Sequence, residues 1–123
     1  MQATDAELET LRVLWQTDGL TASEVHEKLS EIKNRSRTTV LSLLQVMLDK
    51  GLVRRDETKF PQRYHAAVDE EAITGGLLHD FLERVFGGSA RQLLMRLASS
   101  KKSSPAEVRQ IRKMIKELDR EDK

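Results

Sequence analysis

The chain has 123 residues, of which 33% are charged, 38% hydrophobic and 4% aromatic, which is typical of a helix-rich soluble domain and not of an all-β protein. The absence of cysteine excludes disulfides, a thiolate nucleophile and a cysteine-based metal site. No apolar run approaches the roughly 20 residues that span a bilayer and no signal pattern opens the sequence, so we expect a cytoplasmic protein with no membrane partner.

The net charge of +1 hides an asymmetry between neighbouring segments. Residues 1–32 hold two basic and seven acidic side chains, whereas residues 33–65 hold eight basic and three acidic ones. The local charge therefore changes from −5 to +5. Positive charge concentrated on one segment is typical of a polyanion binder, although charged surfaces are common.

Two helices are predicted in the acidic segment. The first runs from Thr4 to about Gln16 and the second follows Thr21, and both begin with the threonine and glutamate spacing of a capping box. Trp15 lies in the apolar stripe of the first helix, so we interpret it as a core anchor and not as a platform for bases.

A third helix is predicted over residues 36–50, where apolar residues recur at the spacing of one buried stripe. Its first turn contains no carboxylate, which leaves the helix N-terminus open to a phosphate. Two short helices followed by a longer one with a polar face form a helix-turn-helix pattern. The candidate DNA-binding residues of this helix and its flank are Arg35, Ser36, Arg37, Thr38, Thr39, Ser42 and Gln45. The alternative is an ordinary amphipathic helix whose polar face meets only water.

A β-hairpin is predicted directly after this helix. Gly51 ends the helix, and strands over residues 52–56 and 62–68 flank a turn over residues 57–61. A hairpin in this position is the wing of a winged helix-turn-helix, and its cations would contact DNA phosphates or the minor groove. These candidate residues are Arg54, Arg55, Lys59 and Arg63. The alternative is a solubilising edge hairpin.

The chain resembles the penicillinase-repressor (BlaI/MecI) family of bacterial transcriptional regulators. Three stretches carry the resemblance: TDAELETLRVLWQ, TASEVHEKL and RTTVLSLLQVMLDKGLVRRDE…RYHAAV. It covers about residues 3–120 and is most specific around Lys50-Gly51-Leu52-Val53. It implies a winged-helix head, a C-terminal helical dimerisation region and repression by occupying palindromic operators.

Residues 69–123 are helical by pattern, so we expect a DNA-binding domain over residues 1–68 and a helical dimerisation region over residues 69–123. Gly75-Gly76 interrupts the first of these helices and allows either a bend or the close approach of another helix. The candidate dimerisation residues are Leu77, Phe81, Leu94, Leu97, Val108, Ile111, Ile115 and Leu118, of which the last four form a narrow seam like that of a coiled coil. A partner subunit would cover them, and the alternative is a monomer whose tail folds back on the head.

No catalytic residue, metal site or cofactor is predicted. The histidines His26, His65 and His79 lie on separate elements without ligand spacing, and no phosphate loop or nucleophile elbow is present. We therefore expect that the protein is not an enzyme. A metal site assembled from His79 and acidic neighbours across a dimer stays open as an alternative.

The resemblance also bears on control. Copper-responsive relatives carry Cys-x-Cys motifs, which this chain lacks, and antibiotic-responsive relatives are cleaved at an Asn-Phe bond, whose position corresponds here to Arg96-Leu97. Val46 stands where many relatives have arginine. A sensor or protease partner therefore stays unknown.

The sequence thus predicts a homodimeric repressor that binds an inverted-repeat operator in double-stranded DNA. Two alternatives are a protein-interaction adaptor, which would use the winged helix and the C-terminal seam, and a DNA-binding regulator that responds to a small molecule.

Overall fold

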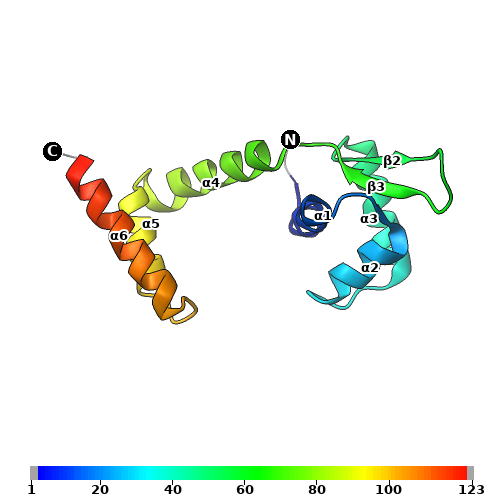
Figure 1. Cartoon of the computed structure of the whole chain (residues 1–123). Coiled ribbons are helices and arrows are strands. Elements are labelled where there is room, and N and C mark those ends of the chain that lie inside the picture. Colours follow the sequence, from blue (N-terminus) through cyan, green and yellow to red (C-terminus); the bar gives the residue numbers. More distant parts are fainter. Residues whose placement is uncertain (1–2, 122–123) are drawn as a thin grey trace. The chain divides into compact units, whose positions relative to one another are not determined.

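The computed structural model of the protein describes residues 3–121 (Figure 1). The chain forms two compact units, Met1–Ile73 and Thr74–Lys123. The elements in chain order are α1 (Asp5–Gln16), β1 (Leu20–Thr21), α2 (Ala22–Ser30), α3 (Arg37–Asp49), β2 (Val53–Asp56), β3 (Arg63–Ala66), α4 (Glu70–Phe86), α5 (Ala90–Ala98) and α6 (Pro105–Glu121). The division between the units falls within α4.

The helices of the first unit begin where the sequence predicts them. Thr4 and Thr21 cap α1 and α2 in complete capping boxes, in which the backbone amide of each cap residue donates a hydrogen bond to the carboxylate of Glu7 or Glu24. Ser36 caps α3 by accepting a hydrogen bond from the Thr39 amide, at 3.1 Å. Each start is therefore fixed by a pattern no longer than four residues.

The C-terminus of α3 is closed by a Schellman motif. Gly51 has a φ of +75°, a conformation that glycine adopts without steric cost. Its amide donates to the Leu48 carbonyl at 3.1 Å, and the Leu52 amide donates to the Met47 carbonyl at 2.9 Å. The turn points the chain directly into the hairpin.

The hairpin belongs to a three-stranded antiparallel sheet. The strand order is β1-β3-β2, with Leu20 opposite Tyr64 on one side and Arg55 opposite Tyr64 on the other. The predicted hairpin is confirmed, but the sequence did not reveal β1. A two-residue strand is too short to show alternation, and it forms only because β3 provides an edge from far along the chain.

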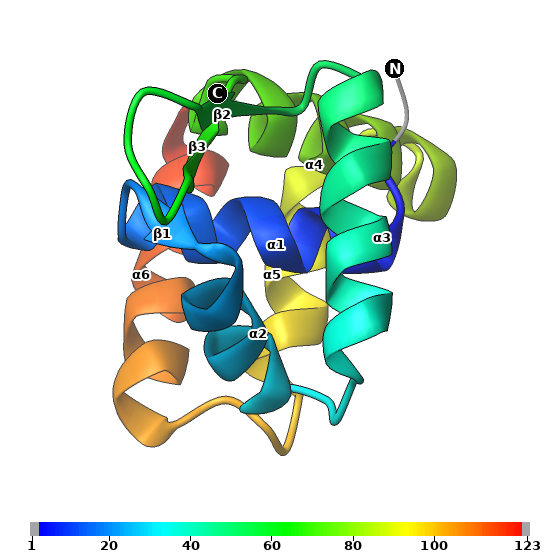
Figure 2. The same cartoon turned by 90° about the vertical axis from the view of Figure 1, so that its right-hand side faces the viewer.

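The core of the first unit lies between its three helices and the sheet, which pack on one another (Figures 1 and 2). It contains Leu11, Val13, Leu14, Leu20, Val25, Leu29, Val40, Leu44, Met47, Leu52, Val53 and Tyr64. Trp15 packs against this core, and its Nε1 donates to the Val68 carbonyl at 3.1 Å. The interpretation of Trp15 as a core anchor is confirmed. With this arrangement, the predicted mainly helical fold with a winged helix-turn-helix head is confirmed.

In the second unit, α5 and α6 pack side by side. Val108, Ile111, Ile115 and Leu118 of α6 are half-buried, so part of the predicted seam is covered by α5 of the same chain. The sequence pattern alone could not distinguish this neighbour from a partner subunit. Within α4 and α5, all of whose residues are described, no side chain is buried.

Large apolar side chains remain exposed in this unit. Leu77, Phe81 and Leu97 are 39%, 47% and 42% exposed, and Leu94 is half-buried. Leu78 and Val85 extend the exposed face of α4. None of the helices among residues 3–121 has the length and apolarity required to cross a membrane.

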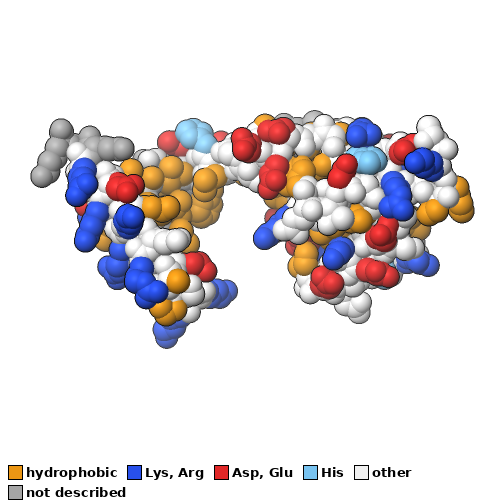
Figure 3. Space-filling model, in the orientation of Figure 1, with side chains coloured by type: hydrophobic (Ala, Val, Ile, Leu, Met, Phe, Trp, Pro, Cys, Tyr) orange, Lys and Arg blue, Asp and Glu red, His pale blue; other side chains and the backbone are white. Residues whose placement is uncertain are grey.

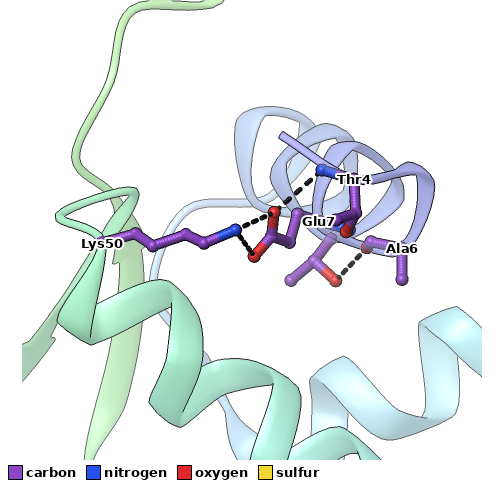
Figure 4. Close-up of polar contacts among 5 residues, drawn as sticks. Thr4, Ala6, Glu7 and Lys50 are labelled. Carbon is purple, nitrogen blue, oxygen red and sulfur yellow. Dashed lines mark hydrogen bonds and ion pairs between the residues drawn. The ribbon is translucent and has the colours of Figure 1, made fainter. Parts of the chain in front are cut away.

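Two carboxylates of α1 hold the two ends of α3. The Glu7 carboxylate contacts Lys50 Nζ, the C-cap of α3, at 3.0 Å (Figure 4). The Glu9 carboxylate accepts a hydrogen bond from Arg35, next to the N-cap of α3, at 2.6 Å. Because α1 belongs to the core, these contacts tie both ends of α3 to the core.

The Glu7 carboxylate is ionised although it is only 1% exposed. Burial raises the pKa of this group, but the amide of Thr4, at 2.8 Å, and the ammonium of Lys50 together lower it below its ordinary value of 4.5. The charge is therefore stable at neutral pH because both of its neighbours donate to it.

Replacing Glu7 by glutamine removes this charge and leaves a side chain of similar size. We expect the free energy of unfolding at pH 7 to fall by about 1–3 kcal/mol, because Lys50 loses its buried partner and the Thr4 amide loses a charged acceptor. Urea titrations followed by circular dichroism would measure the difference.

The pH dependence of this loss provides the control. A lowered folded pKa stabilises the protein above the ordinary value of 4.5, and the stabilisation disappears as the pH falls through the folded pKa. The difference between wild type and Glu7→Gln should therefore shrink toward pH 3. Glu57→Gln, which removes an exposed partner of Arg55, should leave stability nearly unchanged. A Glu7→Gln loss that is constant with pH would contradict an ionised Glu7.

Candidate nucleic-acid interface

The outer face of α3 is the candidate surface in the first unit for contacts with nucleic-acid bases. Val40, Leu44 and Met47 face the core and are at most 1% exposed. Helical geometry turns the opposite face to solvent, and this face consists of Thr38, Leu41, Ser42, Gln45, Val46 and Asp49, all exposed. Hydroxyl, amide, carboxylate and apolar groups follow one another along it. This mixture suits base edges in a major groove, which present donors, acceptors and thymine methyl groups.

Hydrogen bonds in α3 and at its N-cap orient three of the predicted side chains. Gln45 Nε2 donates to Asp49 Oδ1 at 3.1 Å, so the carbonyl oxygen of this amide stays available as an acceptor. Ser36 Oγ and Thr39 Oγ1 lie 2.8 Å apart and form a hydrogen bond in which either hydroxyl can donate. Thr38 and Ser42 project from the exposed face without such a contact among the described residues.

The flank of the α3 N-terminus differs from the prediction at Arg35. Its side chain is 12% exposed and is paired with Glu9, and its backbone carbonyl lies 2.8 Å from His26 Nε2. Arg35 therefore positions α3 and is not presented at the surface as the sequence suggested. Arg37 stays exposed and donates to Ser23 Oγ on α2, which leaves its guanidinium beside the open helix N-terminus.

The basic residues of the wing form two classes. Arg55 pairs with Glu57 at 2.7 Å, and hydrogen bonds from Arg55 to Glu57 and Tyr64 raise the pKa of its guanidinium. Arg63 donates to the Gly19 carbonyl at 2.7 Å and lies 3.4 Å from Glu24.

In contrast, Arg54 and Lys59 form no ion pair with any residue that the structure describes, and both are exposed. The paired cations support the sheet and the turn before β1. The unpaired ones are available to a phosphate at no cost in lost ion pairs.

Two exposed apolar residues of this surface were missed by sequence reasoning. Leu41 is 48% exposed in the middle of the α3 outer face, and Phe60 is 96% exposed at the tip of the wing. A signal existed for Leu41, because it falls outside the stripe that begins at Val40 and continues through Leu44. Phe60 had no such signal, because a turn residue has no periodic neighbours.

Two of the three histidines contact other elements of the first unit. His26 contacts the backbone before α3, and His65 Nδ1 lies 2.9 Å from Asp18 Oδ1, joining β3 to the turn before β1. His79 is exposed on α4. Across residues 3–121, no group of three or more histidine, aspartate or glutamate side chains is placed to hold a metal ion.

Comparison with solved structures identifies a similar fold. A solution structure of the monomeric form of BlaI from Bacillus licheniformis, in complex with the blaP half-operator, matches with a TM-score of 0.52 and 28% identity. The match covers 58% of this chain and 87% of that chain.

Similar sequences extend over most of the chain. The penicillinase repressor of Bacillus licheniformis is 24% identical over 116 residues, which are 94% of this chain and 91% of that protein. The methicillin resistance regulatory protein MecI of Staphylococcus aureus (strain N315) is 21% identical and covers 93% of each chain. The transcriptional regulator BlaI of Mycobacterium tuberculosis is 30% identical over 72% of this chain and 64% of that protein. The family model for the penicillinase repressor matches residues 3–117, so the chain belongs to the penicillinase repressor family.

Proposed function

We propose that this protein is a DNA-binding transcriptional repressor that recognises bases with α3 and contacts phosphates with the wing. The observation that carries the proposal is the outer face of α3, which is exposed along its length while both of its ends are held by α1. A fixed helix with mixed polar and apolar side chains can enter the major groove without reordering.

The relatives support this proposal. They are named as repressors and regulators, and the BlaI structure contains a half-operator. That structure matches 58% of this chain, a share that corresponds to a domain such as the first unit. The adaptor and small-molecule alternatives have no comparable observation in their favour.

The side chains of α3 suggest separate roles. An amide such as that of Gln45 pairs with adenine, and the hydroxyls of Thr38 and Ser42 can contact most bases. The apolar tips of Leu41 and Val46 fit thymine methyl groups. Arg37 and the α3 N-terminus would hold a phosphate, while Arg54 and Lys59 would hold the backbone beside the wing.

We further propose that the protein acts as a homodimer on an inverted repeat. Leu77, Leu78, Phe81 and Val85 form an exposed apolar face on α4, and Leu97 is exposed on α5. A patch of this kind is typical of an interface. A two-fold dimer would present two copies of α3 to two half-sites, as an inverted repeat requires.

Alanine substitutions on α3 test base recognition. Thr38→Ala, Leu41→Ala and Gln45→Ala should each weaken operator binding by about 1–3 kcal/mol and relax the preference at one base-pair position, because each removes a contact to a base edge. Binding selections from randomised half-sites would measure both effects. If all three variants select the same sequence as wild type, the assignment of the α3 face is wrong.

Arg54→Gln provides the contrast, because a phosphate contact carries no base information. This variant should weaken binding to every duplex alike and lower the slope of log K against log salt by about one. Arg12→Gln, which removes an exposed cation from α1, is the matched control and should leave the slope unchanged.

An aspartate at position 81 tests the dimer. Phe81→Asp places a charge in the exposed apolar face of α4, so sedimentation should show a monomer where wild type is a dimer. His79→Asp, which lies on the opposite side of the same helix and is also exposed, should remain dimeric. A wild type that is monomeric at micromolar concentration would contradict the dimer and leave recognition of a single half-site.

A further inference from the structure

The α6 helix carries a row of cations along one face. Its basic residues are Arg109, Arg112, Lys113, Lys116 and Arg120, and all are exposed. Arg112 and Lys113 are adjacent and the other steps are three or four residues, which places all five within a sector of about 100° that extends for about 17 Å. Figure 3 shows the corresponding band of Lys and Arg side chains along α6. We call this set the basic ridge.

The basic ridge is not neutralised by the part of the chain that the structure describes. None of its five cations forms an ion pair with a described residue, and the one acidic residue of α6 in such a pair, Asp119, contacts Arg91 of α5 at 2.9 Å. Glu117 borders the ridge four residues after Lys113 but forms no ion pair with it among the described residues. The positive field of the ridge is therefore open to a partner.

The arrangement is unusual for a helix face that meets only solvent. Neighbours at three or four residues, such as Arg109 and Lys113 or Arg112 and Lys116, repel each other and destabilise the helix. A solvated face ordinarily alternates cations with anions at this spacing. A row of like charges is stabilised when a polyanion neutralises it.

We propose that the basic ridge of α6 binds the phosphate backbone of double-stranded DNA, in addition to the contacts of α3 and the wing. The proposal rests on the DNA-binding function proposed above. The row of cations extends over about 17 Å, which suits a duplex that carries one negative charge per about 1.7 Å of its axis. The contact would carry no base information and would strengthen binding to any flanking sequence.

The structure favours DNA over an anionic membrane as the partner. A helix that lies in a membrane surface needs a free apolar face to bury. In α6 the opposite face, with Val108, Ile111, Ile115 and Leu118, is half-buried and packs toward α5. The basic ridge of α6 is therefore exposed to a partner, whereas most of the apolar face of α6 already packs against α5.

The test compares Lys113→Gln/Lys116→Gln with wild type in the full-length protein. Glutamine keeps the helix propensity of lysine at exposed positions, so folding should be unaffected. DNA binding is titrated over a range of salt concentrations with three duplexes: the operator alone, the operator extended by flanking DNA, and a scrambled sequence of the extended length. On the extended duplex, the variant should lower the slope of log K against log salt by about two, one per lost phosphate contact. The ratio of operator to scrambled affinity should stay as in wild type.

Arg12→Gln/Arg84→Gln is the matched control, because it removes two exposed cations that lie outside the ridge. An equal slope for wild type and the ridge variant would overturn the proposal, as would an equal reduction by the control. Vesicles containing phosphatidylglycerol form a second arm: binding that the ridge variant abolishes, with no change on DNA, would assign the ridge to membranes and also overturn it. If wild type binds operator and scrambled DNA alike, the repressor function fails, while the ridge is still tested by the slope on scrambled DNA.

Discussion

The orientation of α3 depends on two ion pairs, in which carboxylates of α1 contact cations at the two ends of α3. Glu7 contacts the C-cap residue Lys50 and Glu9 contacts Arg35 just before the N-cap. Helix packing in the core turns the apolar stripe of α3 inward, where Val40, Leu44 and Met47 are buried. Charge-assisted hydrogen bonds are directional, so the one at each end adds a restraint on the orientation of the outer face. The carboxylates of the acidic first helix thus neutralise part of the basic segment that follows. Only the cations that remain unpaired are available to DNA.

Because some of these cations are paired within the chain and others are not, the local positive charge overstates the number of cations available to DNA. Among the basic residues that the sequence assigned to DNA, Arg35, Arg55 and Arg63 are engaged by carboxylates of the same chain, whereas Arg54 and Lys59 have no such partner among the described residues. An engaged guanidinium has to give up an ion pair before it can contact a phosphate. The affinity for the DNA backbone should therefore depend on fewer residues than the local charge of +5 over residues 33–65 suggests. In our account, the unpaired cations of the wing and of α6 supply most of this affinity, and the outer face of α3 supplies the specificity.

The features that the sequence predicted correctly are those set within a few residues. The caps at Thr4, Thr21 and Ser36 and the closing turn at Gly51 each depend on a pattern of four to six residues, and the structure contains all of them. The features that it missed depend on distant partners. Strand β1 needs β3, Arg35 needs Glu9, and the apolar side of α6 lies against α5, so no local pattern could reveal them. The exposure of Leu41 was accessible from helical periodicity, but that of Phe60 was not.

The measurement that tests the central claim most directly is a fluorescence-anisotropy titration of the protein with the DNA upstream of its own gene. A scrambled duplex of the same length is titrated beside it, each at two salt concentrations. If α3 recognises bases, the upstream DNA should bind at least about a thousandfold more tightly than the scramble, and both affinities should fall steeply with salt. Equal and weak binding to both duplexes would contradict the claim, because it would leave the outer face of α3 as a solvated surface.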